Sequence, residues 1–189
     1  MEQRGLVGAS SRKGFTLIEL MVVVAVMAVL MSLAAPAMTS MLDAAKMSSL
    51  SNQLLSSLQF TRSEAIKRSG RVVMCKSTTG SSCALDGGWE QGWIVFHDAN
   101  NNAAVDAGEE ILKYESGTGS NLSLTGNTPV ARYVSYTAVG VAKMQSGAFQ
   151  AGTFTLCLKS SPGTEARHII VNKTGRAHVE KTTVTRCQV

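Results

Sequence analysis

The feature that most constrains this chain of 189 residues is an apolar run of helix length close to its beginning. The run extends from Phe15 to Ala37, and Glu19 is its only charged residue. As an α-helix it would be about 34 Å long, which is enough to cross the hydrocarbon core of a bilayer. The sequence therefore predicts a membrane-spanning helix that carries one carboxylate.

A basic leader, residues 1–14, precedes the apolar run and contains Arg4, Arg12 and Lys13. A secretory signal would have its apolar core ahead of the cleavage site. Here the apolar run follows Gly14 directly, so a cut at Gly14 would leave that run on the mature chain. Positive charge ahead of the span predicts that the leader stays in the cytoplasm and that the rest of the chain crosses the membrane.

Glu19 admits two interpretations. A carboxylate within lipid is unfavourable, and a partner such as the amino group of a neighbouring chain would compensate it. Alternatively, Glu19 lies in the headgroup zone near the cytoplasmic face. Farther along, Pro36 ends the purely apolar run and is expected to kink or locally melt the helix.

Residues 38–70 are predicted to form an amphipathic second half of the helix. Apolar residues recur there at helical spacing: Met47, Leu50, Leu54, Leu58 and Ala65. Ser69 and Gly70 supply a stop signal, so the helix is expected to end near Arg68. The apolar stripe is expected to pack on a sheet.

Residues 71–189 are predicted to form a β-rich globular head, which makes the chain as a whole α+β. Short runs of β-forming residues alternate with Gly, Asn, Ser, Thr and Pro clusters and occupy residues 72–74, 93–96, 110–114, 132–136, 154–158 and 168–171. Their spacing suits antiparallel strands. The stretch 116–128 predicts a mobile loop. Trp89 and Trp93 are expected on one face of a strand that covers the helix.

The cysteines form an even set without the spacing of a zinc site: Cys75, Cys83, Cys157 and Cys187. Four cysteines allow three pairings, and the short spacing favours a loop closed by Cys75 and Cys83. Cys157 and Cys187 would then tie the C-terminal tail to the head. Disulfides imply an oxidising compartment such as the periplasm or the cell surface. Buried free thiols are the alternative.

One polar loop has the oxygen-ligand spacing of a calcium-binding loop, at Asp98, Asn100, Asn102, Asp106 and Glu109. Ala103 stands where that loop type needs a glycine, and the flanking residues predict strands rather than helices. A hairpin held by Asx turns would explain the same residues. Calcium is therefore one candidate ligand, and no other cofactor is indicated.

Basic residues gather near the C-terminus, in a predicted hairpin or tail, at Lys173, Arg176, Lys181 and Arg186, with His178 among them. They could neutralise DNA phosphates. The alternative is a solvated strand face, or a surface that docks onto an acidic neighbour. His178 is mostly neutral at pH 7, and the tail has no aromatic ring on which a base could stack.

Catalysis has little support in the sequence. The three histidines, His97, His168 and His178, stand in no recognisable nucleophile or metal motif. The glycines around the tryptophans, including Gly92, indicate turns and bulges rather than a phosphate-binding loop. The chain is therefore predicted not to be an enzyme.

The segment Gly14-Phe15-Thr16-Leu17-Ile18-Glu19 resembles the class III leader junction of type IV pilins and type II secretion pseudopilins. The resemblance implies cleavage between Gly14 and Phe15 by a prepilin peptidase, followed by N-methylation of Phe15. It also implies that Glu19 sets the register during filament assembly. Pro36 matches the helix-breaking proline of such stems.

Four further segments resemble the GspH/FimT group of minor pilins and pseudopilins, with FimU-like members: residues 62–66, 88–96, 98–109 and 174–176. The resemblance implies a pilin fold, in which a long N-terminal helix packs on an antiparallel β head. It also implies a single-pass protein of the inner membrane with its head in the periplasm, which later joins a pilus or pseudopilus. Other major and minor pilins would be its partners.

Three functions are compatible with this resemblance. The first is a minor pilin of a type IV pilus that primes or caps the filament near its tip and supports twitching and adhesion. The second is a GspH-like pseudopilin of the type II secretion system. The third is a FimT-like, DNA-binding minor pilin in natural transformation. The tail of DNA-uptake members resembles Gly-Arg-x-Arg, which this chain matches at Gly175-Arg176 but not at His178.

Overall fold

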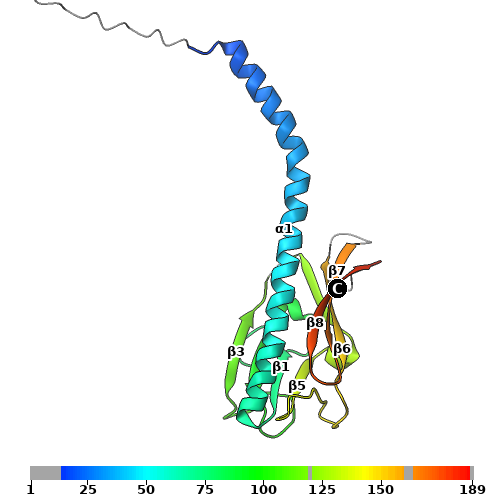
Figure 1. Ribbon diagram of the computed structural model, residues 1–189. Coiled ribbons are helices and arrows are strands. Elements are labelled where there is room, and N and C mark those ends of the chain that lie inside the picture. Colours follow the sequence, from blue (N-terminus) through cyan, green and yellow to red (C-terminus); the bar gives the residue numbers. More distant parts are fainter. Residues whose placement is uncertain (1–13, 119–120, 160–163, 188–189) are drawn as a thin grey trace, which may run out of the picture. The chain divides into compact units, whose positions relative to one another are not determined.

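The computed structural model describes residues 14–118, 121–159 and 164–187, apart from the side chains of residues 33–37 and 164 (Figure 1). The chain divides into two compact units, Met1–Ala44 and Ala45–Val189. One helix, α1 (Leu17–Arg68), contributes to both.

In the first unit, α1 presents large apolar side chains from Leu17 to Met31 that are exposed. Thr16 caps the helix start, because its Oγ1 accepts a hydrogen bond from the backbone N–H of Glu19 at 3.3 Å. Within the described residues, no helical stretch combines the length and the apolarity needed to cross a membrane.

The helix does not melt at Pro36, since α1 continues through this position to Arg68; a kink at Pro36 stays a prediction. A proline inside a helix removes one backbone hydrogen bond and can kink the helix without ending it. The loss is local and does not end a helix of 52 residues.

In the second unit, the apolar stripe of α1 is buried as predicted, at Met47, Leu50, Leu54, Leu58 and Ala65. The helix also ends where expected. Ser69 adopts a φ of 50°, and the N–H of Gly70 bonds to the carbonyl of Ala65 at 3.2 Å. This left-handed residue with its backward hydrogen bond is a Schellman-type end.

The head contains two antiparallel four-stranded sheets. The first has the order β3-β2-β1-β5 and comprises β1 (Val72–Lys76), β2 (Gly92–His97), β3 (Ile111–Ser116) and β5 (Tyr133–Tyr136). The second has the order β4-β6-β7-β8 and comprises β4 (Leu122–Gly126), β6 (Gly152–Leu158), β7 (Thr164–Val171) and β8 (Ala177–Val184). Two short 3₁₀ helices, η1 (Trp89–Gln91) and η2 (Thr128–Val130), complete the head. The predicted α+β class is confirmed.

Part of the predicted mobile loop at 116–128 is strand β4 instead. Leu122 and Leu124 of this strand are buried, and they pair with Leu158 and Leu156 of β6. The alternation of apolar and polar residues in this segment is too short to predict a strand among so many turn-forming residues. A partner distant in the chain therefore decides the structure here.

One apolar core joins both sheets to the second half of α1, as Figure 1 shows by the course of the helix along them. Trp89 and Trp93 both belong to this core, as predicted, but only Trp93 lies in a strand. Trp89 lies in η1, because Gly92 takes a φ of 114° and separates the two residues. The Trp89 ring packs edge-on against Phe154 with centroids 5.2 Å apart.

Both favoured disulfides are confirmed, Cys75–Cys83 and Cys157–Cys187. The first closes a local loop after β1. The second fixes the segment after β8 to β6, and Cys157 and Cys187 are both buried. No cysteine is free.

Candidate functional site

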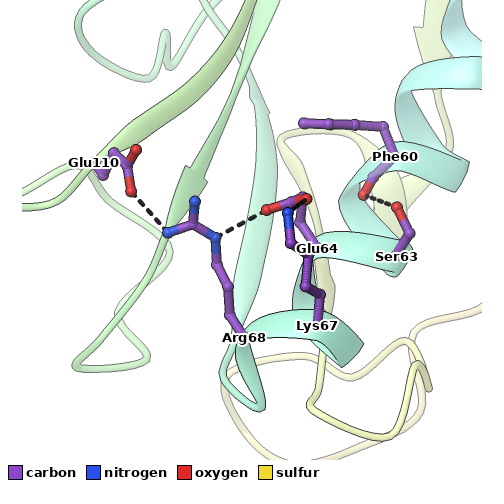
Figure 2. Close-up of polar contacts among 6 residues, drawn as sticks. All are labelled: Phe60, Ser63, Glu64, Lys67, Arg68 and Glu110. Carbon is purple, nitrogen blue, oxygen red and sulfur yellow. Dashed lines mark hydrogen bonds and ion pairs between the residues drawn. The ribbon is translucent and has the colours of Figure 1, made fainter.

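The end of α1 is tied to the head by an ion network (Figure 2). Arg68 Nε lies 2.9 Å from Glu64 Oε2, and Arg68 Nη1 lies 2.7 Å from Glu110 Oε2, just before β3. Lys67 adds a second contact to Glu64 at 3.2 Å. The hydrogen bond from Arg68 lowers the pKa of Glu64, although burial acts against it. The 62–66 segment thus anchors the helix end.

The polar loop between β2 and β3 is held by hydrogen bonds within the loop. The Asp98 carboxylate accepts from the N–H groups of Asn102 and Ala103, at 3.1 and 3.0 Å. At the other end of the loop, Glu109 accepts from the N–H groups of Ala99 and Asp106. These are the Asx-type contacts of a polar hairpin.

Three of the predicted calcium ligands are hydrogen-bonded to one another in this arrangement. Asp106 Oδ2 accepts from the side-chain amides of Asn100 and Asn102, at 2.7 and 2.6 Å. In the described parts of the chain, no three His, Cys, Asp or Glu side chains group in a way that could hold a metal. Calcium binding stays a prediction, which calorimetric titration of the head would test.

The basic C-terminal residues belong to the hairpin of β7 and β8, but they do not form a single patch. His178 pairs with Ile170 and Lys181 with Arg167, so the two side chains lie on opposite faces of the sheet. His178 Nε2 also lies 3.1 Å from Glu180 Oε1. Lys173 and Arg176 lie in the turn, and Arg186 follows β8. Two of the five predicted DNA contacts, His178 and Lys181, therefore lie on different surfaces.

Sequence reasoning missed Asn172, which shapes this turn. Its Oδ1 accepts hydrogen bonds from the N–H groups of Thr174 and Arg176, both at 3.0 Å. Gly175 has a φ of 78°, and its N–H bonds to the Asn172 carbonyl at 2.9 Å. An asparagine shortly before a glycine is a turn signal that was available in the sequence. The turn presents Arg176 to solvent.

The residues predicted for processing and assembly lie at the beginning of α1. Gly14 and Phe15 precede the helix, and Glu19 lies in its first turn. All three are exposed. Their cleavage, methylation and assembly roles stay predictions.

The three histidines do not converge on a reaction centre. His97 ends β2, His168 lies in β7 and His178 lies in β8. His168 and His178 belong to one sheet, but His168 pairs with Glu180 and His178 with Ile170. Within the described residues, none of the three histidines forms a hydrogen bond with a hydroxyl or thiol side chain that could act as a nucleophile.

Comparison with known proteins gives two family matches. The family described as type II transport protein GspH matches residues 50–175, which is more than half of the chain. The prokaryotic N-terminal methylation motif matches residues 9–35. Among curated proteins, the pilin-like protein PilA1 of Thermus thermophilus is 25% identical over 178 residues, which cover 90% of this chain and 99% of that protein.

Among solved structures, the type IV minor pilin FimU of Pseudomonas aeruginosa PAO1 is similar in two crystal forms. The first has a TM-score of 0.57 at 18% identity and covers 77% of this chain and 98% of the crystallised FimU chain. The second has a TM-score of 0.54 at 19% identity and covers 75% and 99%. This similarity shows a shared pilin fold. With the family matches, it establishes that the chain belongs to the GspH family of minor pilins and pseudopilins, whose members are structural proteins rather than enzymes.

Proposed function

We propose that this chain is a minor pilin of a type IV pilus that primes or caps the filament near its tip. The observation that carries the proposal is the combination of two parts in one chain. A methylation-motif helix with exposed apolar side chains leads into a head whose fold is similar to FimU over 98% of the crystallised FimU chain. The apolar stem of such a protein can exchange its contacts with lipid for contacts with other helices, while the head stays folded.

In this proposal, residues 15–37 hold the protein in the inner membrane before assembly, with the head in the periplasm. The two disulfides support an exported head. A prepilin peptidase cuts between Gly14 and Phe15, and Phe15 is then N-methylated. N-terminal mass analysis of the protein from its native host tests this step. A mature chain that begins anywhere but at Phe15 would contradict it.

A GspH-like pseudopilin of the type II secretion system is the second candidate. The observation in its favour is the family match over residues 50–175. The same stem and head would then cap a periplasmic pseudopilus instead of a surface pilus.

A DNA-binding role in transformation is the third candidate, supported by the exposed Arg176 in the Gly-Arg turn. The division of the basic residues between faces speaks against a continuous phosphate-binding track. A gel-shift series with the head tests this role. Absence of binding at low salt would contradict the DNA-binding role.

Deletion of the gene separates the candidates when surface pili, enzyme secretion and transformation are scored in parallel. We expect loss or shortening of surface pili with secretion intact. Intact pili with lost secretion would favour the pseudopilin instead. Loss of transformation alone, with pili and secretion intact, would favour the DNA-binding role.

A further inference from the structure

A cleft of about 220 Å³ lies where the second half of α1 meets the turn between β7 and β8. Its lining comes from three parts of the fold, and comprises Gln59, Arg62, Tyr136, Gly175, Arg176 and Ala177. Gln59 and Arg62 belong to α1, and Tyr136 ends β5. The cleft therefore forms only when helix, sheet and turn are all in place.

Arg62 is held in position on the wall of the cleft. Its Nε donates a hydrogen bond to the Gly140 carbonyl at 2.8 Å. Gly140 has a φ of 73°, and a side-chain carbon there would lie 3.0 Å from Arg62 Nε and 2.8 Å from Ile66 Cδ1. The contact uses one of the five N–H donors of a guanidinium group. The terminal N–H groups of Arg62 have no partner within the described residues.

The cleft is positively charged. Arg62 and Arg176 both line it, and no carboxylate is among its lining residues. Neither arginine takes part in an ion pair with any residue that the structure describes. Two guanidinium groups without a counterion favour the binding of an anion.

Tyr136 supplies a further donor. Its side chain is fully buried, and its hydroxyl is among the buried polar atoms that have no hydrogen-bond partner in the described chain. Such an atom is unfavourable until a partner satisfies it. Burial raises the pKa of Tyr136, an effect that the nearby charge of Arg62 partly offsets. The hydroxyl therefore stays protonated at physiological pH and can donate.

We propose that this cleft binds a carboxylate from an acidic side chain of a neighbouring filament subunit. Arg62 and Arg176 would hold its two oxygens, and the Tyr136 hydroxyl would donate to one of them. Guanidinium groups match a carboxylate in geometry as well as in charge. The identity of the partner rests on the proposed filament function, whereas the carboxylate site itself does not.

A side-chain carboxylate fits this cleft better than a DNA phosphate does. Tyr136 lines the cleft but its hydroxyl is closed to solvent, so a ligand must enter the cleft on a narrow stem and the Tyr136 side chain must shift for the hydroxyl to donate. An Asp or Glu side chain can enter in this way, whereas a duplex presents its phosphates along a broad convex surface. A duplex also needs several cations along one face, and His178 and Lys181 lie on opposite faces of their sheet.

The head alone is suitable for the test. All buried hydrophobic side chains among the described residues lie between Met47 and Cys187, and both disulfides lie within the same range. A fragment of residues 45–189 therefore keeps the complete core. The probes are acetate and inorganic phosphate, titrated into this isotope-labelled fragment and followed by NMR.

We expect saturable acetate-dependent shifts in the amides of residues 175–177 and in the Arg62 side chain. Arg176→Gln should weaken acetate binding by about tenfold or more, because it removes a charged hydrogen-bond donor. Tyr136→Phe should weaken it while keeping the ring in the core. Lys181→Gln, on the same hairpin but outside the cleft, is the matched control and should leave binding unchanged.

Equal acetate shifts in wild type and Arg176→Gln would overturn the site. Tighter binding of phosphate than of acetate would overturn the choice of a carboxylate. A photoreactive amino acid in place of Gln59 then tests the partner in cells. We expect cross-links to another filament subunit, in a segment that contains Asp or Glu. Cross-links only to segments without acidic residues would overturn the proposed partner. These results do not depend on whether deletion abolishes pili or secretion, so the two proposals fail separately.

Discussion

Gly175 and Gly140 approach so closely that a side-chain carbon on Gly175 would lie 2.4 Å from the Gly140 carbonyl oxygen. The same carbon would lie 3.0 Å from the Tyr136 ring. This contact joins the turn between β7 and β8 to the loop after β5. It explains why the Gly-Arg turn carries a glycine at this position.

Gly175→Ala should therefore destabilise the head strongly. Besides the strain of a left-handed alanine, the new methyl group collides with backbone atoms that cannot swing aside. Gly147→Ala is the matched control, because Gly147 has a similar φ of 84° and open space around it. We expect a cost of about 1 kcal/mol for Gly147→Ala and about 2 kcal/mol more for Gly175→Ala. Urea unfolding measures both, and equal losses would contradict the contact.

Glu64→Gln should remove part of the acid sensitivity of the head. The pKa of Glu64 is lowered in the folded state by its hydrogen bond to Arg68. A carboxyl with a lowered pKa stabilises the fold above its unfolded pKa of about 4.5, and this stabilisation is lost as the pH falls through the folded pKa. At pH 7 the variant should lose about 0.5–1 kcal/mol.

The two unfolding curves of this experiment should converge at low pH. Tryptophan fluorescence in urea, measured between pH 7 and pH 3, follows them. Glu110→Gln serves as the control, since the Glu110 side chain is largely exposed and its ion pair is with the terminal Nη1 of Arg68. A Glu64→Gln variant with the wild-type pH dependence would show that the pair is not coupled to folding.

The two disulfides should differ in their contribution to stability. Cys157–Cys187 spans 30 residues and Cys75–Cys83 spans 8. A longer loop restricts the unfolded chain more. Replacing Cys157 and Cys187 by alanine should therefore cost about 3.5 kcal/mol, and replacing Cys75 and Cys83 about 2.5 kcal/mol. Thermal unfolding of the two double variants tests the order. The reverse order would show that native contacts, rather than loop length, determine the difference.

The sequence predicted those parts of the fold whose signals are local. The apolar stripe from Met47 to Ala65 and the stop at Ser69 and Gly70 are both read within one helix, and they are confirmed. The cysteine pairing followed from spacing and chain order. The residues that determine the helix and its end are near one another in the chain. For the disulfides, only three pairings of four cysteines exist.

Features that depend on distant contacts could not be predicted in this way. Strand β4 is defined by its pairing with β6. The separation of Trp89 from the strand of Trp93 depends on the backbone of Gly92, where a side-chain carbon would lie 2.6 Å from the Glu115 carbonyl. The cleft residues Arg62 and Tyr136 lie far apart in the chain. Only the folded sheet and the helix bring them together.

The Glu19 carboxylate has two interpretations from the sequence, a neighbouring amino group or the headgroup zone as its surroundings. Glu19 lies in the first turn of α1, and this segment is separate from the compact head. Glu19→Val should therefore leave the stability of the head unchanged. It should abolish incorporation into filaments if a neighbouring amino terminus compensates the carboxylate.

Fractionation of sheared filaments, with detection of this subunit by immunoblotting, measures incorporation of the Glu19→Val variant. Glu19→Asp keeps the negative charge on a shorter side chain. It should retain part of the incorporation into filaments, because a carboxylate is still present for the amino group of the neighbour. Normal incorporation of Glu19→Val would support a headgroup position instead. In that case the carboxylate would need no protein partner, since water and lipid headgroups would solvate it.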